Sequence, residues 1–81
     1  MDGKINPKGR DAPYIQVAKI LERRIRDGVY EPDERMPSES ELMREFEIGR
    51  NTARAAVAWL RDAGLVETVP TRGTFVIPRP E

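Results

Sequence analysis

Three arginines recur at helical spacing within residues 48–61 and give this stretch a basic side. Arg50, Arg54 and Arg61 fall close together when the sequence is plotted at about 100° per residue. An apolar stripe lies roughly 120° away by the same geometry and consists of Ala53, Ala56, Val57 and Leu60. A helix that is buried on one side and carries guanidinium groups on another fits the major groove of DNA. A solvated basic face is the alternative, and the flanking sequence decides between the two.

The composition excludes several kinds of functional site. A chain of 81 residues forms one domain whose small core leaves no room for an ordinary substrate cleft. It contains no cysteine and no histidine, which removes disulfides, Cys/His zinc sites and histidine bases. We therefore expect no metal and no cofactor. The carboxylates are scattered, and their spacing assigns Glu39, Glu41, Glu45 and Glu47 to the cap and surface of a helix, so we do not expect an enzyme.

No apolar run in the sequence approaches the length of a membrane span. The first residues also lack the apolar core of a secretory signal. These two features predict a cytoplasmic protein without a membrane partner.

The net charge of zero argues at first against a nucleic-acid partner. The charges are nevertheless unevenly distributed. Residues 50–79 hold only Asp62 and Glu67 as acidic residues, against Arg50, Arg54, Arg61, Arg72 and Arg79. We therefore expect a basic carboxyl-terminal half that still binds DNA, with modest non-specific affinity for phosphate.

Two helices are predicted before the arginine-bearing one. Residues 1–12 are polar and contain glycine and proline, which predicts a flexible arm. Helical spacing of apolar residues predicts a helix over residues 13–27, with Pro13 in its first turn and Gly28 after its end. A loop with a short extended piece at Arg35 and Met36 follows it.

A capping box marks the start of the second helix. Ser38 and Glu41 have the spacing of a reciprocal cap, and we predict a helix over residues 38–46. Three residues, with Ile48 pointing into the core, separate it from a third helix over residues 50–63. Two short helices joined in this way, the second carrying arginines, indicate a helix-turn-helix.

The sequence changes its period after Gly64. Residues 65–69 and 74–77 are rich in β-branched side chains and are joined by turn-forming residues, which predicts a β-hairpin. We therefore predict a mainly α winged helix-turn-helix over residues 13–78, with a two- to three-stranded antiparallel sheet and a tail of residues 79–81. Arg72 at the hairpin tip would reach a minor groove or a phosphate; a solvated turn residue is the alternative.

The ordered set of motifs resembles the DNA-binding domain of the GntR family of bacterial transcription regulators. The resemblance covers residues 13–77. Its most specific parts are Arg35-Met36-Pro37-Ser38-Glu39, Arg50-Asn51-Thr52-Ala53-Arg54, Ala63-Gly64-Leu65-Val66 and Thr71-Arg72-Gly73-Thr74-Phe75-Val76. It implies a repressor that binds double-stranded DNA, with two copies of the domain as a dimer on a palindromic operator.

The resemblance also implies which residues contact DNA. Ser38 and Ser40 lie at the start of the second helix, and the wing, residues 70–74, meets the minor groove or backbone through Thr71, Arg72 and Gly73. The third helix enters the major groove with Arg50, Asn51, Thr52 and Arg54. Which arginine reads a base and which holds a phosphate stays open.

Three positions depart from the family pattern. Ser40 stands where an arginine is usual, and Gly49 replaces the usual Ser or Thr cap. Glu47 stands where a turn glycine is common, and a left-handed conformation would cost it roughly 1 kcal/mol, so we expect a reshaped turn.

Trp59 leaves a second function open. It lies roughly 100–120° from the apolar stripe, on the side away from the arginines. Partial burial against the arm or the wing is one interpretation. The other is an exposed anchor of a protein–protein interaction module that uses the same fold.

Overall fold

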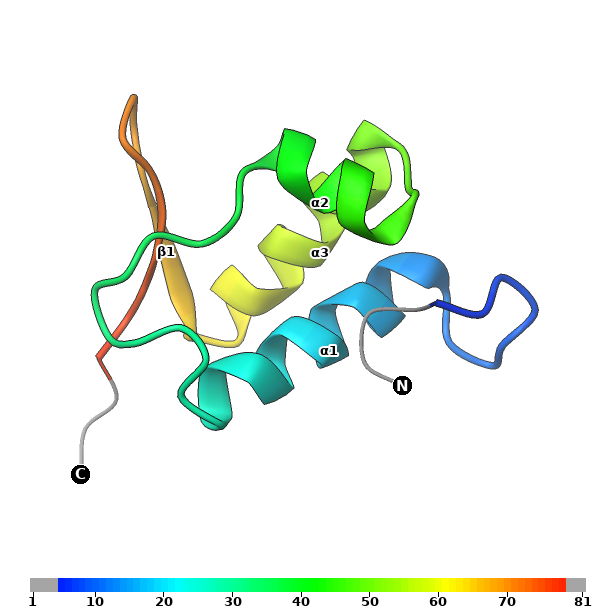
Figure 1. Cartoon of the computed structure of the whole chain (residues 1–81), viewed down its shortest axis with the longest axis horizontal. Helices are drawn as coiled ribbons and strands as arrows, with labels where there is room; N and C mark the ends of the chain where they lie inside the picture. The colour runs from blue at the N-terminus through cyan, green and yellow to red at the C-terminus, as the bar shows by residue number, and fades with distance from the viewer. Residues whose placement is uncertain (1–4, 79–81) are drawn as a thin grey trace.

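Three helices precede a β-hairpin in the computed structural model (Figure 1). The structure describes residues 5–78, so the predicted tail and the first four residues of the predicted arm lie outside it. The elements are α1 (Pro13–Arg26), α2 (Glu39–Phe46), α3 (Arg50–Asp62), β1 (Val66–Val69) and β2 (Gly73–Val76). This architecture confirms the predicted winged helix-turn-helix.

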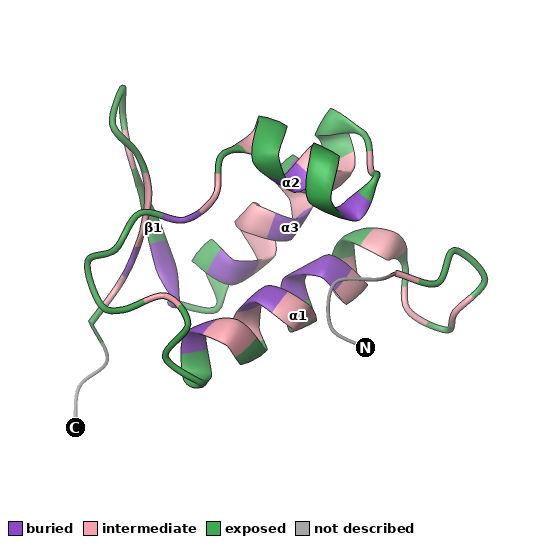
Figure 2. Cartoon of the chain, viewed as in Figure 1, coloured by how far each residue is buried: buried purple, intermediate pink, exposed green. Residues whose placement is uncertain are grey.

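The core lies where the apolar sides of the three helices meet (Figure 2). Val17, Leu21 and Leu60 are fully buried, and so are the two small residues Ala53 and Ala56 of α3. These alanines carry only a methyl group each, so α1 and α3 pack side by side along the predicted stripe. The fourth member of the stripe, Val57, is only half-buried, because it lies at the edge of the packed surface.

Each predicted helix is one residue longer than the observed one, because the prediction included the cap residue at one end of each helix. Asp27 caps α1 with Gly28 following it in the left-handed region (φ 82°). Ser38 caps the start of α2, and Ala63 caps the end of α3. The ends therefore lie where the sequence placed them, to within the cap.

The wing is an antiparallel pair in which Val66 faces Val76 and Val69 faces Gly73. The predicted extended piece before α2 adds to it through an isolated bridge between Arg35 and Phe75. The amide of Met36 donates to the Thr74 carbonyl at 2.7 Å. Near the turn, β2 therefore pairs with β1 on one side and with the segment at Arg35 and Met36 on the other. This arrangement is the two- to three-stranded sheet that was predicted.

Arg24 links α1 to α2. Its Nη2 donates to Oε2 of Glu45 at 2.6 Å, and its Nη1 donates to the Tyr30 hydroxyl at 3.1 Å. The guanidinium also lies 5.5 Å from the centre of the Phe46 ring, within cation–π range. These contacts give Arg24 a structural role.

The described part of the predicted arm, residues 5–12, contacts the start of α1. The Asn6 amide donates to Oε1 of Gln16 at 2.6 Å, and Lys19 pairs with Asp11 at 3.0 Å. Whether the arm is flexible in solution stays a prediction. None of the helices within residues 5–78 is long and apolar enough to cross a membrane.

Trp59 is half-buried and packs against the hydrophobic core. Partial burial was one of its two predicted states, although the contact is with the core rather than specifically with the arm or wing. Its area available to a partner is correspondingly reduced.

The turn between α2 and α3 is built on a left-handed glutamate. Glu47 has φ 55° and ψ 52°, and the following amide of Ile48 donates to the Met43 carbonyl at 3.2 Å. Ile48 is half-buried against the core, as predicted. The expectation of a reshaped turn is wrong: the chain keeps the left-handed geometry and accepts the steric cost of a Cβ atom there.

Replacing Glu47 by glycine is therefore expected to stabilise the domain. Glu47→Gly should raise the free energy of unfolding above that of Glu47→Ala by about 1 kcal/mol, since both remove the charge but only glycine removes the Cβ clash. Urea unfolding followed by circular dichroism measures the difference. Equal stability of the two variants would contradict strain at this position.

Candidate nucleic-acid interface

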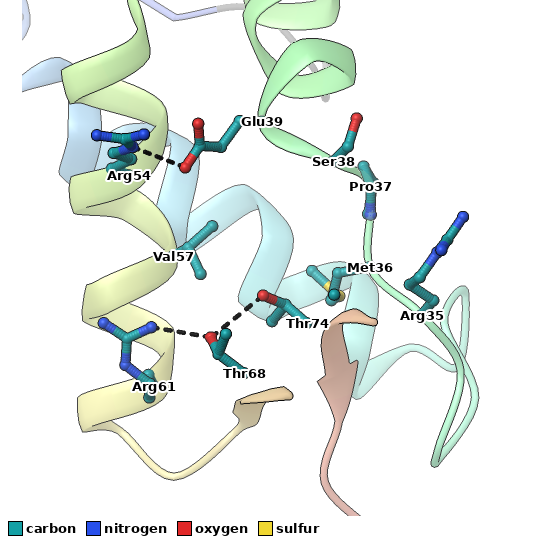
Figure 3. Close-up of a pocket in the computed structure, with 11 residues that line it drawn as sticks. Arg35, Met36, Pro37, Ser38, Glu39, Arg54, Val57, Arg61, Thr68 and Thr74 are labelled. Carbon is teal, nitrogen blue, oxygen red and sulfur yellow. Dashed lines mark hydrogen bonds and ion pairs between the residues drawn. The ribbon is translucent and has the colours of Figure 1, made fainter. Parts of the chain in front are cut away.

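A hollow of about 510 Å³ lies between α3, the start of α2 and the hairpin (Figure 3). Three arginines, from α3 and from the segment before α2, contribute to its lining, and so do three hydroxyl side chains. The arginines are Arg35, Arg54 and Arg61, and the hydroxyls belong to Ser38, Thr68 and Thr74. Met36, Pro37 and Val57 add an apolar part to the same lining.

The start of α3 presents its predicted contact residues to solvent. Arg50 and Arg54 have side chains 63% and 60% exposed. Asn51 is exposed and Thr52 half-buried. Burial of the alanine side on α1 fixes the rotation of the helix, so both guanidinium groups project outward as the sequence predicted.

Glu39 of α2 lies between these two arginines, and the sequence analysis had assigned it only to a cap or surface. Its Oε2 accepts a hydrogen bond from Nε of Arg54 at 2.8 Å, and its Oε1 lies 3.9 Å from Nε of Arg50. One carboxylate therefore partly neutralises both cations. No local spacing signals this contact, because it depends on the angle at which α2 and α3 meet.

The capping box at the start of α2 is complete. Oγ of Ser38 accepts from the Glu41 amide at 3.1 Å, and Oε1 of Glu41 accepts from the Ser38 amide at 2.8 Å. The hydrogen bond from the Ser38 amide, followed by the bond with the Ser38 side chain, lowers the pKa of Glu41 below its ordinary value.

Ser38→Ala is expected to raise the pKa of Glu41 and to lower the midpoint of thermal unfolding. The carboxylate loses part of the network that favours its charged form. A lowered pKa in the folded state contributes stability above the unfolded-state pKa, and this contribution is lost as the pH falls through the lowered value. An NMR titration of the Glu41 side chain measures the pKa.

Ser40→Ala is the matched control, since Ser40 is exposed in the same helical turn and takes no part in the cap. It should leave the Glu41 pKa unchanged. An identical Glu41 pKa in the two variants would show that the Ser38 hydroxyl contributes nothing.

The wing turn carries the remaining predicted contacts. Thr71, Arg72 and Gly73 are exposed at the tip of the hairpin, which projects past the helices (Figure 1). The Arg72 amide donates to the Val69 carbonyl at 3.0 Å and closes the turn. The Arg72 side chain is therefore presented at the end of the wing.

Arg61 differs from the other two arginines of its stripe. Its Nη1 donates to Oγ1 of Thr68 in β1 at 3.0 Å, and that oxygen lies 3.3 Å from Oγ1 of Thr74 in β2 (Figure 3). Arg61 thus connects α3 to both strands of the wing. All three arginines of the predicted basic stripe are exposed, and Arg61 in addition supports the sheet.

The family model for bacterial regulatory proteins of the gntR family matches residues 13–76. The chain belongs to the GntR family. The resemblance inferred from the motifs is thereby confirmed, and the family is one of regulatory proteins rather than enzymes.

Curated GntR relatives match the chain over most of its length. The histidine utilization repressor of Klebsiella aerogenes is 38% identical over 71 residues, covering 86% of this chain and 30% of the relative. The HTH-type transcriptional repressor NagR of Bacillus subtilis (strain 168) is 38% identical over 72 residues, with 89% and 30% covered. The chain therefore spans less than a third of the length of these relatives.

Solved GntR structures share the fold. AraR(DBD) in complex with operator ORX1 has a TM-score of 0.81 and 33% identity, with 90% of this chain and 93% of that chain covered. YtrA from Sulfolobus acidocaldarius, a GntR-family transcription factor, has a TM-score of 0.87 at 25% identity, with 99% and 84% covered.

Two departures from the GntR pattern have visible structural effects. Gly49 caps α3 without a side-chain hydrogen bond, so the first amides of that helix receive no hydroxyl. Ser40 is exposed in the first turn of α2 and offers a short hydroxyl in place of a guanidinium. Both changes leave the fold intact and reduce the number of groups that reach outward from this face.

Proposed function

We propose that this GntR domain is a sequence-specific, double-stranded-DNA-binding module of a transcription regulator that acts as a repressor. The observation that supports it most is the outward projection of Arg50 and Arg54 from a helix whose other side is buried. A recognition helix enters the major groove with its amino-terminal residues toward the bases. The likeness to AraR(DBD), whose structure contains operator DNA, supports DNA binding by this fold.

We assign the contacts by element. Arg50 and Arg54 read base edges or hold phosphates in the major groove, and Asn51 and Thr52 contact the backbone near them. Ser38 and Ser40 donate to phosphate from the start of α2, where the exposed amides also favour an anion. The wing contacts the minor groove or the backbone through Thr71, Arg72 and Gly73.

In this proposal, two copies of the domain bind as a dimer to the two half-sites of a palindromic operator. The protein acts in the cytoplasm. A two-fold protein arrangement requires a matching two-fold sequence, so half-site spacing follows from the distance between the copies. Selection from a randomised duplex pool would return both the half-site and the spacing.

Removing Arg54 tests the assignment of the recognition helix. Arg54→Ala should lower affinity for the selected duplex by about tenfold or more relative to a scrambled duplex, because a bidentate arginine contributes about 1–3 kcal/mol of discrimination. Fluorescence anisotropy with both duplexes measures the ratio. Arg23→Ala, which removes an exposed arginine from α1, is the control and should change nothing.

Binding of the unaltered protein to random duplex at low salt, with steep weakening as salt rises, distinguishes a DNA-binding domain from a protein-contacting one. A module anchored by Trp59 would show no such binding. Unchanged discrimination by Arg54→Ala would place the base contacts outside α3.

Glu39 is proposed to limit non-specific binding. Arg50 and Arg54 must weaken or break their ion pairs with Glu39 when they bind phosphates or bases. Exposed ion pairs of this kind are weak, so contacts with DNA can replace them. The same carboxylate holds the two side chains close together before DNA arrives. Glu39 thus favours binding to duplexes that make base contacts with the arginines in addition to phosphate contacts.

Glu39→Gln should bind random duplex more tightly than the unaltered protein. Its slope of log affinity against log salt should steepen by up to about 0.9 for each further phosphate neutralised. Glu31→Gln, at an exposed loop position, makes the same change of charge away from the arginines and should have little effect. Equal gains from both variants would indicate a general charge effect.

A further inference from the structure

The turn of the wing holds Thr71 in a conformation that a β-branched residue does not favour. Thr71 has φ 64°, and Gly73 has φ 119°. A β-branched residue in the left-handed region is strained. Such backbone geometry persists only where the surrounding structure fixes it, and it is common at ligand-binding sites.

Arg35 is the side chain from outside the hairpin that lies against this turn. A Cβ atom built on Gly73 would come within 3.0 Å of Cδ and 3.5 Å of Cγ of Arg35. The aliphatic part of Arg35 therefore covers the space that the glycine leaves open. Its Nη1 also donates to the Arg72 carbonyl, at 3.4 Å.

The backbone around Arg35 is fixed independently of its side chain. It bridges to Phe75, and the neighbouring bonds join Met36 to Thr74 at 2.7 Å and Val76 to Glu34 at 2.9 Å. The segment then leads directly into the cap of α2. Arg35 lies on the segment that leads to Pro37 and Ser38 (Figure 3).

Arg35 has no ion pair among residues 5–78, whereas Arg26 and Arg54 each have one. Its side-chain hydrogen bond is to the Arg72 carbonyl, and its charge also contributes to lowering the pKa of Glu41. Covering Gly73 and binding the Arg72 carbonyl restrict the backbone of the turn, while the side chain of Arg72 stays free to meet a ligand.

We propose that Arg35 is a positioning residue for DNA binding, which holds the wing turn and so determines where Arg72 meets the duplex. The role rests on the proposed function, since DNA is the ligand of the wing. Arg35 acts through Arg72 rather than through a phosphate contact of its own. A side chain at position 73 would be disfavoured by the positive φ of 119° and would also crowd the Arg35 stem.

A double-mutant cycle tests the coupling of the two arginines. Arg35→Ala should weaken binding of the duplex selected by the unaltered protein by about threefold to tenfold, and by less than about twofold in an Arg72→Ala background. Arg35→Lys, whose stem also covers Gly73, should restore most of the affinity. Arg23→Ala removes the same charge from α1 and should show no loss in either background.

Amide hydrogen exchange tests the same role without DNA. The Arg72 amide, which donates to Val69, should exchange at least several-fold faster in Arg35→Ala than in the unaltered protein, with core amides unchanged. Arg35→Met, which keeps the apolar stem but cannot bind the Arg72 carbonyl, provides a second comparison if the alanine variant loses its fold.

The results of these experiments distinguish failure of the Arg35 positioning role from failure of the proposed DNA-binding function. An equal loss of affinity in both Arg72 backgrounds, or no loss in either, would overturn the role of Arg35. Unchanged exchange at the Arg72 amide would also overturn it. Failure of the unaltered protein to bind any duplex would contradict the proposed function, while the exchange measurement would still report on the contact.

Discussion

The seating of α3 on α1 is the constraint on which the candidate interface depends. Ala53 and Ala56 are completely buried, as is Leu60 one turn further along. A helix packed in this way has no freedom to rotate about its axis, because rotation would expose apolar surface. The directions of its other sides are therefore fixed as well, and Arg50 and Arg54 must face solvent. The arginines of α3 form an exposed basic surface because the apolar side of the helix is buried.

The positive charge of Arg50 and Arg54 is partly balanced by nearby negative charge. The chain has no net charge, and Glu39 pairs with both exposed guanidinium groups of α3. Long-range attraction to phosphate is correspondingly small. Under the proposed function, close contacts in the grooves would carry a larger share of the binding free energy than simple neutralisation of charge. Ser40, which stands where an arginine is usual in the family pattern, acts in the same direction.

The wing is attached to the helical body at several points. Arg61 connects α3 to Thr68, and the segment before α2 pairs with β2 beside the turn. A side-chain contact thus holds β1, and backbone pairing holds β2. The start of α3 and the wing turn are thereby held in fixed relative positions, so under the proposed function a duplex would have to match both together. This coupling is what distinguishes a supported wing from an ordinary exposed hairpin.

Local chemistry in the sequence determined the helices, the capping box of Ser38 and Glu41, the hairpin and the outward side of α3. Each depends on residues within a few positions of one another, through helical period, capping or β-propensity. Tertiary structure alone decided the partners of the functional side chains. Glu39 meets Arg54 across 15 positions, and Arg35 meets the Arg72 carbonyl across 37. The packing angle of the helices and the sheet pairing create these contacts, and no local period encodes either.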